Sequence, residues 1–387
     1  RTQRIARQQL TKLDETSRRK ALGTGGGFFL GSLLGKNEKD KLANAADATI
    51  NEVKDDLLAD LPMVRLRLPK AGIGREYVAL QMKVQGKGPY DFMVDTGLTT
   101  ELITPHLLQS LGLAEGKNRV KGLAAGGGTD NPLVSLKDAA LCCGKFADDK
   151  TELPLPTLTA VVTDFPQEHI DPAHDPVEGM LGMEMLSLFD VDFDFPAGRI
   201  RFWKPGTAKD AAKKAGLVDI PAVVINESGL IAIRTNTPGT KQPVLGLLDC
   251  GATFSALNWK AAEILGFPPK DDAKAYANVP AINAIGIDGG LIQMPTRKTQ
   301  LTFSGDTKKT PSGELTFNQP PSNWKPWNPV TLAIGDLPVF RDLLGDGRNP
   351  YEGPACLIGL DILAQRRVIF ETGGPRTQQR KIWVSPK

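Results

Sequence analysis

The chain has 387 residues, more than the ~250 to 300 beyond which a single hydrophobic core usually stops growing, so two core-bearing units with appendages are expected. Hydrophobic residues at 41% and charged residues at 24% argue against wholesale disorder, and 40 glycines with 29 prolines favour turn-rich β structure over an all-helical bundle. A net charge of +3 gives no reason to expect nucleic acid as a partner. Three histidines and four cysteines without a CxxC pair do not suggest a metal centre or a disulfide scaffold.

The first 35 residues have the order of an export signal. Seven Lys or Arg residues lie within the first 20 positions, and a glycine-rich apolar run follows at 21–35. Arg18-Arg19 before this run resembles a twin-arginine signal, and Ala43-Asn44-Ala45 would suit a signal peptidase. The run is shorter than the ~20 residues of a transmembrane helix. Residues 1–35 are therefore predicted to form a membrane tether or a tail held by a partner. The alternative is a flexible basic leader that carries no targeting signal.

Apolar residues then recur at three- and four-residue steps between 36 and 61, which predicts one amphipathic helix ending at Pro62. The residues that carry this pattern are Leu42, Ala46, Ile50, Val53, Leu57 and Leu61. Residues 1–62 are accordingly predicted to form a helical and extended N-terminal extension with no counterpart in the rest of the chain.

The remaining residues contain an internal repeat. After Pro62 the pattern alternates at 63–68 and 77–84, which predicts strands. Residues 92–99, FMVDTGLT, then match residues 246–253, GLLDCGAT, and a Leu-Gly pair follows each copy at the same spacing. Further on, 180–186 matches 357–363. This duplication predicts two similar lobes, 63–206 and 207–387, with a linker at 204–215 and a surface loop at 304–329 in the second lobe.

The repeated motif predicts a pair of aspartates. Asp95 and Asp249 each follow an apolar run and precede a glycine. Near two-fold symmetry would bring equivalent positions together, and two adjacent carboxylates share one proton, which provides one acid and one base that can activate water. Gly97 and Gly251 would allow the two turns to approach each other. The hydroxyl of Thr96 would link the turns, whereas Cys250 offers only a weak thiol donor.

These motifs resemble those of the aspartic proteases, with a two-lobed pepsin-like architecture and retropepsin-like halves, over residues 63–387. Among these proteins the chain is most similar to the plastid-type aspartyl-protease-like proteins of algae and plants. The resemblance implies a mainly β, bilobal acid-protease fold and an endopeptidase of peptide or protein substrates, with Asp95 and Asp249 as catalytic residues and no metal or cofactor. Leu181-Gly182 and Ile358-Gly359 match the elements that pack beneath the catalytic motifs. The glycine-rich positions proposed as flaps are Gly126, Gly127, Gly286 and Gly289.

Two departures from the family pattern keep alternatives open. Leu98 stands where these enzymes carry Ser or Ala, and Cys250 where Thr or Ser is usual. The first alternative is a catalytically silent subunit or assembly factor that docks on a thylakoid membrane complex of the chloroplast through residues 1–62. The alternative location is another membrane-associated or exported compartment. The second is a peptide-binding module that does not cut. The segment 168–175 has enough His and carboxylate groups for a divalent metal, but its prolines favour a solvated loop.

Overall fold

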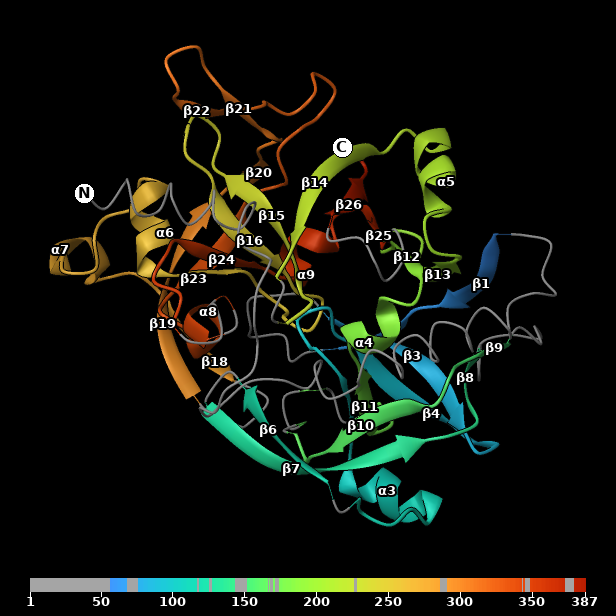
Figure 1. Ribbon diagram of the computed structural model, residues 1–387. Coiled ribbons are helices and arrows are strands. Elements are labelled where there is room, and N and C mark those ends of the chain that lie inside the picture. Colours follow the sequence, from blue (N-terminus) through green and yellow to red (C-terminus); the bar gives the residue numbers. More distant parts are fainter. Residues whose placement is uncertain are drawn as a thin grey trace.

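The computed structural model describes residues 56–67, 76–116, 118–124, 127–142, 152–165, 167, 170, 174–225, 228–285, 291–342, 344, 349–372 and 379–387. The chain is mainly β and has two lobes, built from two large sheets of which the larger extends across both lobes (Figure 1). The expected fold class, mainly β and bilobal with an internal duplication, is confirmed.

The first lobe consists of short strands with two short helices, and a third helix, α5, follows its last strand. The strands are β1 (Leu57–Pro62), β2 (Val64–Leu66), β3 (Tyr77–Val84), β4 (Lys87–Val94), β5 (Glu101–Ile103), β6 (Arg119–Ala124), β7 (Gly127–Leu136), β8 (Ala139–Cys142), β9 (Glu152–Pro154), β10 (Leu158–Val162), β11 (Val177–Leu181), β12 (Asp190–Asp194) and β13 (Arg199–Trp203). The helices are α3 (Pro105–Leu111), α4 (Met183–Leu186) and α5 (Ala208–Lys214).

The second lobe repeats this composition. Its strands are β14 (Val218–Val224), β15 (Ile231–Asn236), β16 (Val244–Leu248), β17 (Ala256–Leu257), β18 (Ala281–Ile285), β19 (Leu291–Thr299), β20 (Thr302–Phe303), β21 (Thr307–Lys309), β22 (Leu315–Phe317), β23 (Val330–Ile334), β24 (Ala355–Ile358), β25 (Arg367–Glu371) and β26 (Gln379–Val384). Its helices are α6 (Trp259–Ile264), α7 (Ala273–Tyr276), α8 (Pro338–Asp342) and α9 (Leu360–Leu363).

The two lobes share one strand topology around the Asp-x-Gly motifs. In the first lobe β4 is parallel to β11, β5 is antiparallel to β11 and parallel to β10, and β7 is antiparallel to β10. In the second lobe β16 is parallel to β24, β17 is antiparallel to β24 and parallel to β23, and β19 is antiparallel to β23. The sequence repeat therefore corresponds to a repeat of the strand pairing, which places the two motifs at equivalent strand ends.

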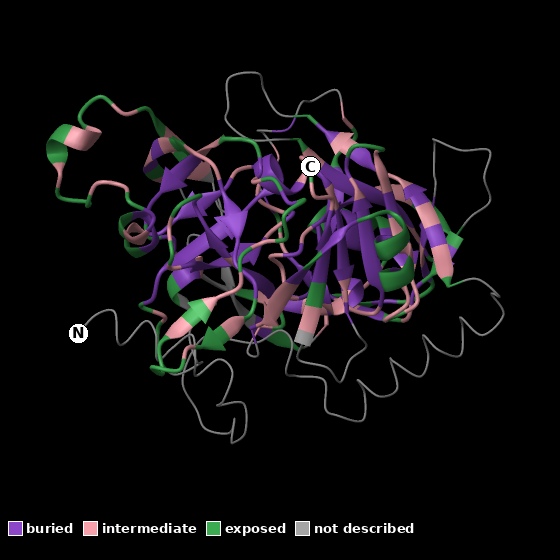
Figure 2. Cartoon of the chain, turned by 90° about the horizontal axis from the view of Figure 1, so that it is seen from above, coloured by how far each residue is buried: buried purple, intermediate pink, exposed green. Residues whose placement is uncertain are grey.

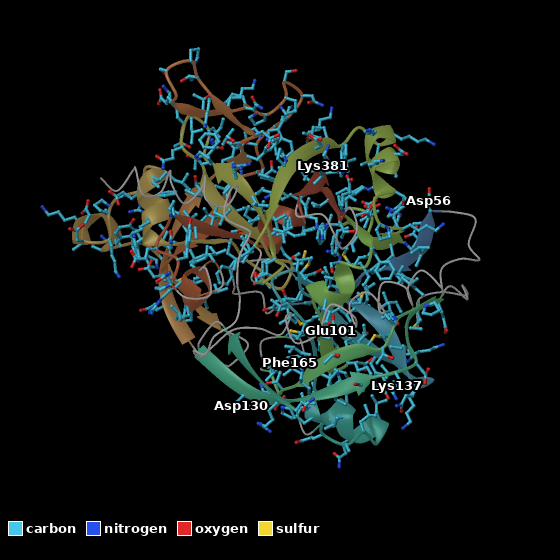
Figure 3. All side chains as sticks on the ribbon, in the orientation of Figure 1. Asp56, Glu101, Asp130, Lys137, Phe165 and Lys381 are labelled. Carbon is cyan, nitrogen blue, oxygen red and sulfur yellow. The ribbon has the colours of Figure 1, made fainter. Side chains whose placement is uncertain are left out.

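Apolar side chains fill both lobes and continue between them. Buried segments concentrate in the strands of both sheets, whereas helices such as α5 expose one face (Figure 2). Phe193 of the first lobe packs edge to face against Phe370 of the second. Charged side chains such as Asp130 and Lys137 lie at the periphery (Figure 3). Burial of the shared apolar surface is thus a main contribution to holding the lobes together.

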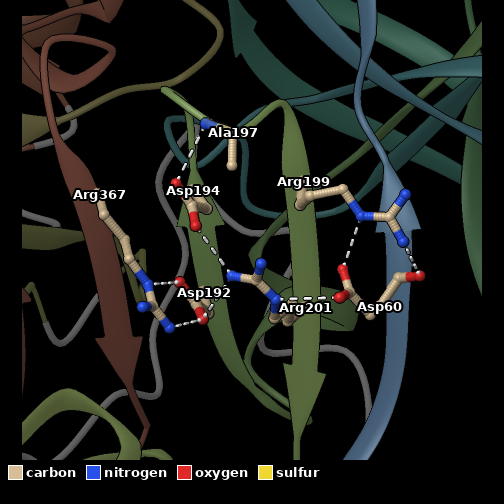
Figure 4. A network of polar contacts seen from close by, with 7 residues as sticks. All are labelled: Asp60, Asp192, Asp194, Ala197, Arg199, Arg201 and Arg367. Atoms are coloured by element: carbon tan, nitrogen blue, oxygen red, sulfur yellow. Dashed lines mark hydrogen bonds and ion pairs between the residues drawn. The ribbon is translucent and has the colours of Figure 1, made fainter. Parts of the chain in front are cut away.

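An ionic network crosses the strands that join the lobes (Figure 4). β12 of the first lobe pairs with β25 of the second. The side chain of Asp192 on β12 is fully buried and accepts two hydrogen bonds from Arg367 on β25, at 2.8 and 2.6 Å. Arg201 faces the same carboxylate and also pairs with Asp60 on β1. Because the buried charge has guanidinium partners on both sides, its desolvation is compensated and the network fixes the register between the lobes.

The prediction that the amphipathic helix continues to Pro62 is wrong. Leu57–Pro62 forms strand β1, which pairs antiparallel with β13, and the rest of that helix lies outside the described residues. In the second lobe β14 pairs with β26 in the same way. The reason for the difference is that Ala59 and Leu61 are buried by strand pairing, which outweighs a helical spacing carried by only a few residues.

Two further segments differ from expectation. The predicted linker contains helix α5, which is seven residues long and buries Ala208 and Ala212. The predicted surface loop at 304–329 forms the hairpin β21–β22 and then buries Trp324 and Trp327. Arg366 stacks over both indole rings, so the end of this segment is anchored to the second lobe.

Within the described part of the chain, no helix is long and apolar enough to cross a membrane.

Candidate active site

The strand pairing brings Asp95 and Asp249 to equivalent places. Asp95 follows β4 and its backbone N–H donates to the carbonyl of Leu181 at 3.0 Å. Asp249 follows β16 and its N–H donates to the carbonyl of Ile358, also at 3.0 Å. Each aspartate is therefore held by one additional backbone hydrogen bond, which extends the parallel strand pairing that precedes it.

The two hydrophobic-Gly elements pack beneath the aspartate loops, as the resemblance implies. The N–H of Met183 donates to Leu98 O and the N–H of Leu360 donates to Ala252 O, both at 2.8 Å. A Cβ on Gly182 would lie 2.5 Å from Thr100 O, and a Cβ on Gly359 would lie 2.5 Å from Phe254 O. Only glycine fits between each loop and its supporting strand, so both motifs contribute to positioning the aspartates.

Gly97 and Gly251 bring the two loops into contact. A Cβ built on Gly97 would lie 2.5 Å from Cγ of Asp249, and one built on Gly251 would overlap Cγ of Asp95. Each glycine thus lies directly against the carboxyl group of the other lobe. The predicted close approach of the two turns is present in the structure, and it leaves no space for a side chain at either position.

Thr96 links the two turns. Its hydroxyl donates to the carbonyl of Leu248 at 3.0 Å and accepts from the N–H of Cys250 at 2.9 Å. Both partners belong to the other lobe, and Thr96 and Cys250 are each 1% exposed. Burial raises the pKa of the Cys250 thiol, so this thiol stays protonated. The hydroxyl therefore forms the predicted connection between the loops.

We expect Thr96→Val to lower the free energy of unfolding by about 2 kcal/mol, because it leaves a buried N–H and a buried carbonyl without their partner. Urea unfolding of the two variants Thr96→Val and Thr96→Ser measures this. Thr96→Ser keeps the hydroxyl and should retain most of the stability. Equal stability of the two variants would contradict the role given to the hydroxyl.

The two carboxyl groups contact each other and the backbone of their own turns. Asp95 Oδ1 accepts from the N–H of Gly97 at 2.8 Å. Asp249 Oδ1 accepts from Gly251 at 2.8 Å and from Ala252 at 3.1 Å. The side chains of Asp95 and Asp249 also share a hydrogen bond. A carboxyl pair that shares a hydrogen bond holds one proton between its members.

Burial raises the pKa of both aspartates, and the backbone N–H of Gly97 partly offsets this at Asp95. At Asp249 the charge of Asp95 adds to the effect of burial, so the pKa of Asp249 lies well above its ordinary value. The two carboxyl groups therefore titrate as a pair that retains one proton above the range in which an isolated aspartate has lost its proton.

Leu98 and the proposed flap positions occupy different surroundings. Leu98 is partly buried and packs against the smaller apolar cluster of the first lobe, which includes Met93 and Met180. Gly127 begins β7, which pairs with β6 in a hairpin. Gly126, Gly286 and Gly289 lie outside the described residues, but 286–290 connect β18 to β19, which form the corresponding hairpin of the second lobe.

Two residues near the dyad were not identified from the sequence. Tyr77 begins β3, and burial together with the charges of Asp249 and Asp95 raises the pKa of Tyr77 to about 12. Glu101 is fully buried in β5 and accepts from the N–H of Met185, two residues after Met183, whose N–H donates to Leu98 O. Both belong to segments without an unusual local pattern. Glu101 follows Thr99 and Thr100 at the start of β5, so the sequence gives no signal that its carboxyl group is buried.

The described residues contain no cluster of His, Cys, Asp and Glu that could hold a metal ion. Most of the segment 168–175, considered above as a metal site, lies outside the described residues, and His174 accepts a hydrogen bond from the N–H of Arg67.

A family model described as aspartyl protease matches residues 80–185. No curated protein matches the sequence. Among solved structures, basic 7S globulin from soybean is 10% identical with a TM-score of 0.42, covering 86% of this chain and 95% of that one. Conglutin gamma, a basic 7S globulin from lupine seeds, is 12% identical with a TM-score of 0.41, covering 86% and 96%. The stretch that this family model matches contains Asp95 and its supporting Leu181-Gly182 element.

Proposed function

We propose that the protein is an aspartic endopeptidase that hydrolyses peptide bonds with a water molecule activated between Asp95 and Asp249. The observation that carries the proposal is the hydrogen-bonded pair of carboxyl groups, one from each lobe, held at equivalent strand ends. The match of the first lobe to the aspartyl protease family supports the same chemistry.

The two carboxyl groups and water are sufficient for the reaction. Asp95, ionised, takes a proton from the water as its oxygen attacks the amide carbonyl carbon, and Asp249 donates its proton to the carbonyl oxygen. The tetrahedral intermediate then collapses as the C–N bond breaks and the leaving nitrogen takes up the proton held by Asp95. The carbonyl re-forms as its hydroxyl returns a proton to Asp249. Every proton and bond is accounted for without a metal or cofactor.

The roles follow from the surroundings of the two carboxyl groups. Asp249 has the more strongly raised pKa, because the charge of Asp95 adds to its burial, and it is therefore the acid. Asp95 has the N–H of Gly97 to stabilise its charge, and it is therefore the base. Activity should require the pair to carry one proton, which confines it to the acidic range in which only one member is ionised.

A peptide or protein substrate would lie across the dyad between the lobes. We propose the hairpins β6–β7 and β18–β19, which hold corresponding places in the strand order of the two lobes, as the flaps that would cover the substrate.

The test uses the purified full chain with denatured protein as substrate and a statine-type transition-state mimic as ligand, from pH 3 to 7. Cleavage and inhibitor binding are expected in the acidic part of this range. Asp95→Asn should lower turnover by at least about 10³-fold without unfolding the chain, whereas Asp219→Asn, on the exposed surface of β14, should not. Absence of both cleavage and inhibitor binding over the whole range would overturn the proposal.

A second candidate is an aspartic-protease-like body that docks on a membrane complex, proposed here for the thylakoid, without cutting. One observation favours it: Leu98, the residue after the first Asp-x-Gly motif, is bulky and offers no hydroxyl to Asp95. The same experiment distinguishes the two candidates. The chloroplast location and the membrane contact rest on residues 1–62, of which 1–55 lie outside the described residues.

A further inference from the structure

A hydroxyl near the end of each aspartate loop is bonded to the helix that follows the supporting hydrophobic-Gly element. In the second lobe, the hydroxyl of Ser255 donates to Asp361 Oδ1 at 2.6 Å. In the first lobe, the hydroxyl of Thr100 donates to Glu184 Oε2 at 2.8 Å. Asp361 on α9 and Glu184 on α4 each lie two residues after the glycine of the element. The same kind of bond, from a hydroxyl to an acid, therefore occurs in both copies of the repeat.

In the second lobe the same hydroxyl also holds the glycine of the element. The oxygen of Ser255 accepts from the N–H of Gly359 at 2.9 Å. Ser255 is 0% exposed and Asp361 is 7% exposed. A Cβ on Gly359 would lie 2.5 Å from Phe254 O, so the backbone of this glycine also touches the residue before Ser255. Ser255 thus uses its hydroxyl both as a donor and as an acceptor, with two buried partners.

The element that Ser255 holds is the one that positions Asp249. The carbonyl of Ile358 accepts from the N–H of Asp249 at 3.0 Å, and the N–H of Leu360 donates to Ala252 O at 2.8 Å. The N–H of Ala252 in turn donates to Asp249 Oδ1 at 3.1 Å. Gly359 lies between Ile358 and Leu360 in the chain. A displacement of Gly359 would therefore reach both the backbone and the carboxyl group of Asp249.

We propose that Ser255 is a positioning residue of the dyad. Its hydroxyl, bonded to Asp361, fixes the backbone of Gly359 beneath the aspartate loop. This contact sets where the carboxyl group of Asp249 lies relative to that of Asp95. The inference rests on the proposed function and adds a residue to its site. Placement matters because the attacking water and the substrate carbonyl must contact both carboxyl groups, and a misplacement of about 1 Å can lower the rate about 10²-fold.

Loss of the hydroxyl should affect catalysis and the motion of the loop in the same variant. In Ser255→Ala the N–H of Gly359 loses its acceptor, so the element and the loop above it shift. We expect kcat to fall about tenfold or more with little change in KM, because the acid is misplaced while the substrate contacts remain. The N–H groups of Gly251 and Ala252, which donate to Asp249 Oδ1, should exchange with solvent about tenfold faster.

The experiment compares Ser255→Ala with Thr372→Val, each in the full chain. Thr372 is 1% exposed, and its hydroxyl donates at 3.1 Å to Asp190, another fully buried carboxyl group. Asp190 lies on β12, one of the strands that join the lobes. Both changes remove a hydroxyl from a buried acid, so urea unfolding should show comparable losses of stability. The fall in kcat and the faster exchange are expected in Ser255→Ala alone.

A second pair of variants keeps the test decisive if Ser255→Ala does not fold. Asp361→Leu removes the acceptor of the Ser255 hydroxyl, whereas Asp361→Asn keeps an oxygen that can accept. Asp361→Leu should therefore lower kcat, and Asp361→Asn should retain most of it. Because Ser255 and Asp361 share one bond, combining Ser255→Ala with Asp361→Leu should lower kcat by less than the product of the two single effects.

The two readouts, kcat with KM and the exchange of Gly251 and Ala252, separate this proposal from the proposed function. Faster exchange in Ser255→Ala or Asp361→Leu, and not in Thr372→Val, supports the positioning role even if the wild type does not cleave peptides, a result that overturns the peptidase alone. Cleavage by the wild type with an unchanged kcat in the folded variants overturns the role of Ser255 and leaves the peptidase intact. No cleavage together with unchanged exchange overturns both.

Discussion

Gly97→Ala is expected to lower kcat/KM by about 10²-fold or more and the free energy of unfolding by about 3 kcal/mol. The added Cβ would lie 2.5 Å from Cγ of Asp249 and 2.7 Å from both of its carboxylate oxygens, distances that real Cβ atoms essentially never show. Asp249 cannot turn aside without losing the N–H donors of Gly251 and Ala252. The methyl group must therefore separate the two loops, and with them the two carboxyl groups.

Urea unfolding, statine-type inhibitor binding and kcat/KM together measure this effect. Gly251→Ala should behave in the same way, because its Cβ would overlap the carboxyl group of Asp95. Gly112→Ala is the matched control: Gly112 has φ +70° and no atom within 4 Å of an added Cβ, so this change strains the backbone far from the dyad. If Gly97→Ala lost no more stability than Gly112→Ala and still bound the inhibitor, the close approach of the loops would be disproved.

The paired aspartates could be predicted from sequence because duplication is visible in a single chain. Two motifs at matching positions imply near two-fold symmetry, and symmetry brings equivalent residues together whatever the intervening loops do. For the same reason Gly97, Gly251 and Thr96 could be assigned roles that the geometry supports. Local alternation was sufficient to predict β3 as a strand, although the structure buries Val78 to Met82 without interruption.

The features that could not be predicted depend on contacts between distant segments. Strand β1 resembles a helix in its spacing and is a strand because β13 lies beside it. Tyr77 lies close enough to Asp249 and Asp95 for their charges to raise its pKa, and no local pattern indicates this proximity. Arg366 is buried against the indole rings of Trp324 and Trp327, and nothing in the spacing of these residues indicates their contact.

Glu101→Gln should change how the stability of the protein depends on pH. Glu101 is 0% exposed, its Oε1 accepts from the N–H of Met185 at 2.9 Å, and its Oε2 has no hydrogen-bond partner among the described residues. Burial, and then the nearby charge of Glu184, raise the pKa of Glu101 well above the ordinary value of 4.5. At the corresponding place in the second lobe, Ser255 accepts from the N–H of Gly359 and donates to Asp361.

The sign follows from proton binding. Below pH 4.5, Glu101 is protonated in both the folded and the unfolded chain and contributes no pH dependence. Between 4.5 and the raised pKa, the folded chain keeps the proton and the unfolded chain has lost it, so each added pH unit removes about 1.4 kcal/mol of stability. Above the raised pKa this loss is complete. The contribution of Glu101 to stability is therefore largest in acid and falls as the pH rises.

In Glu101→Gln this loss is removed, because the amide does not ionise. Unfolding by urea from pH 4 to 8 should show a shallower decline with pH than in the wild type, together with a loss of about 1 kcal/mol in acid, where the amide nitrogen lacks a partner. The exposed Glu263→Gln controls for the loss of one carboxyl group. Parallel curves for wild type and Glu101→Gln would show that Glu101 titrates like an exposed glutamate. A shallower curve would mean that the loop carrying Asp95 is held most firmly in the acidic range, where the shared proton of the dyad is also retained.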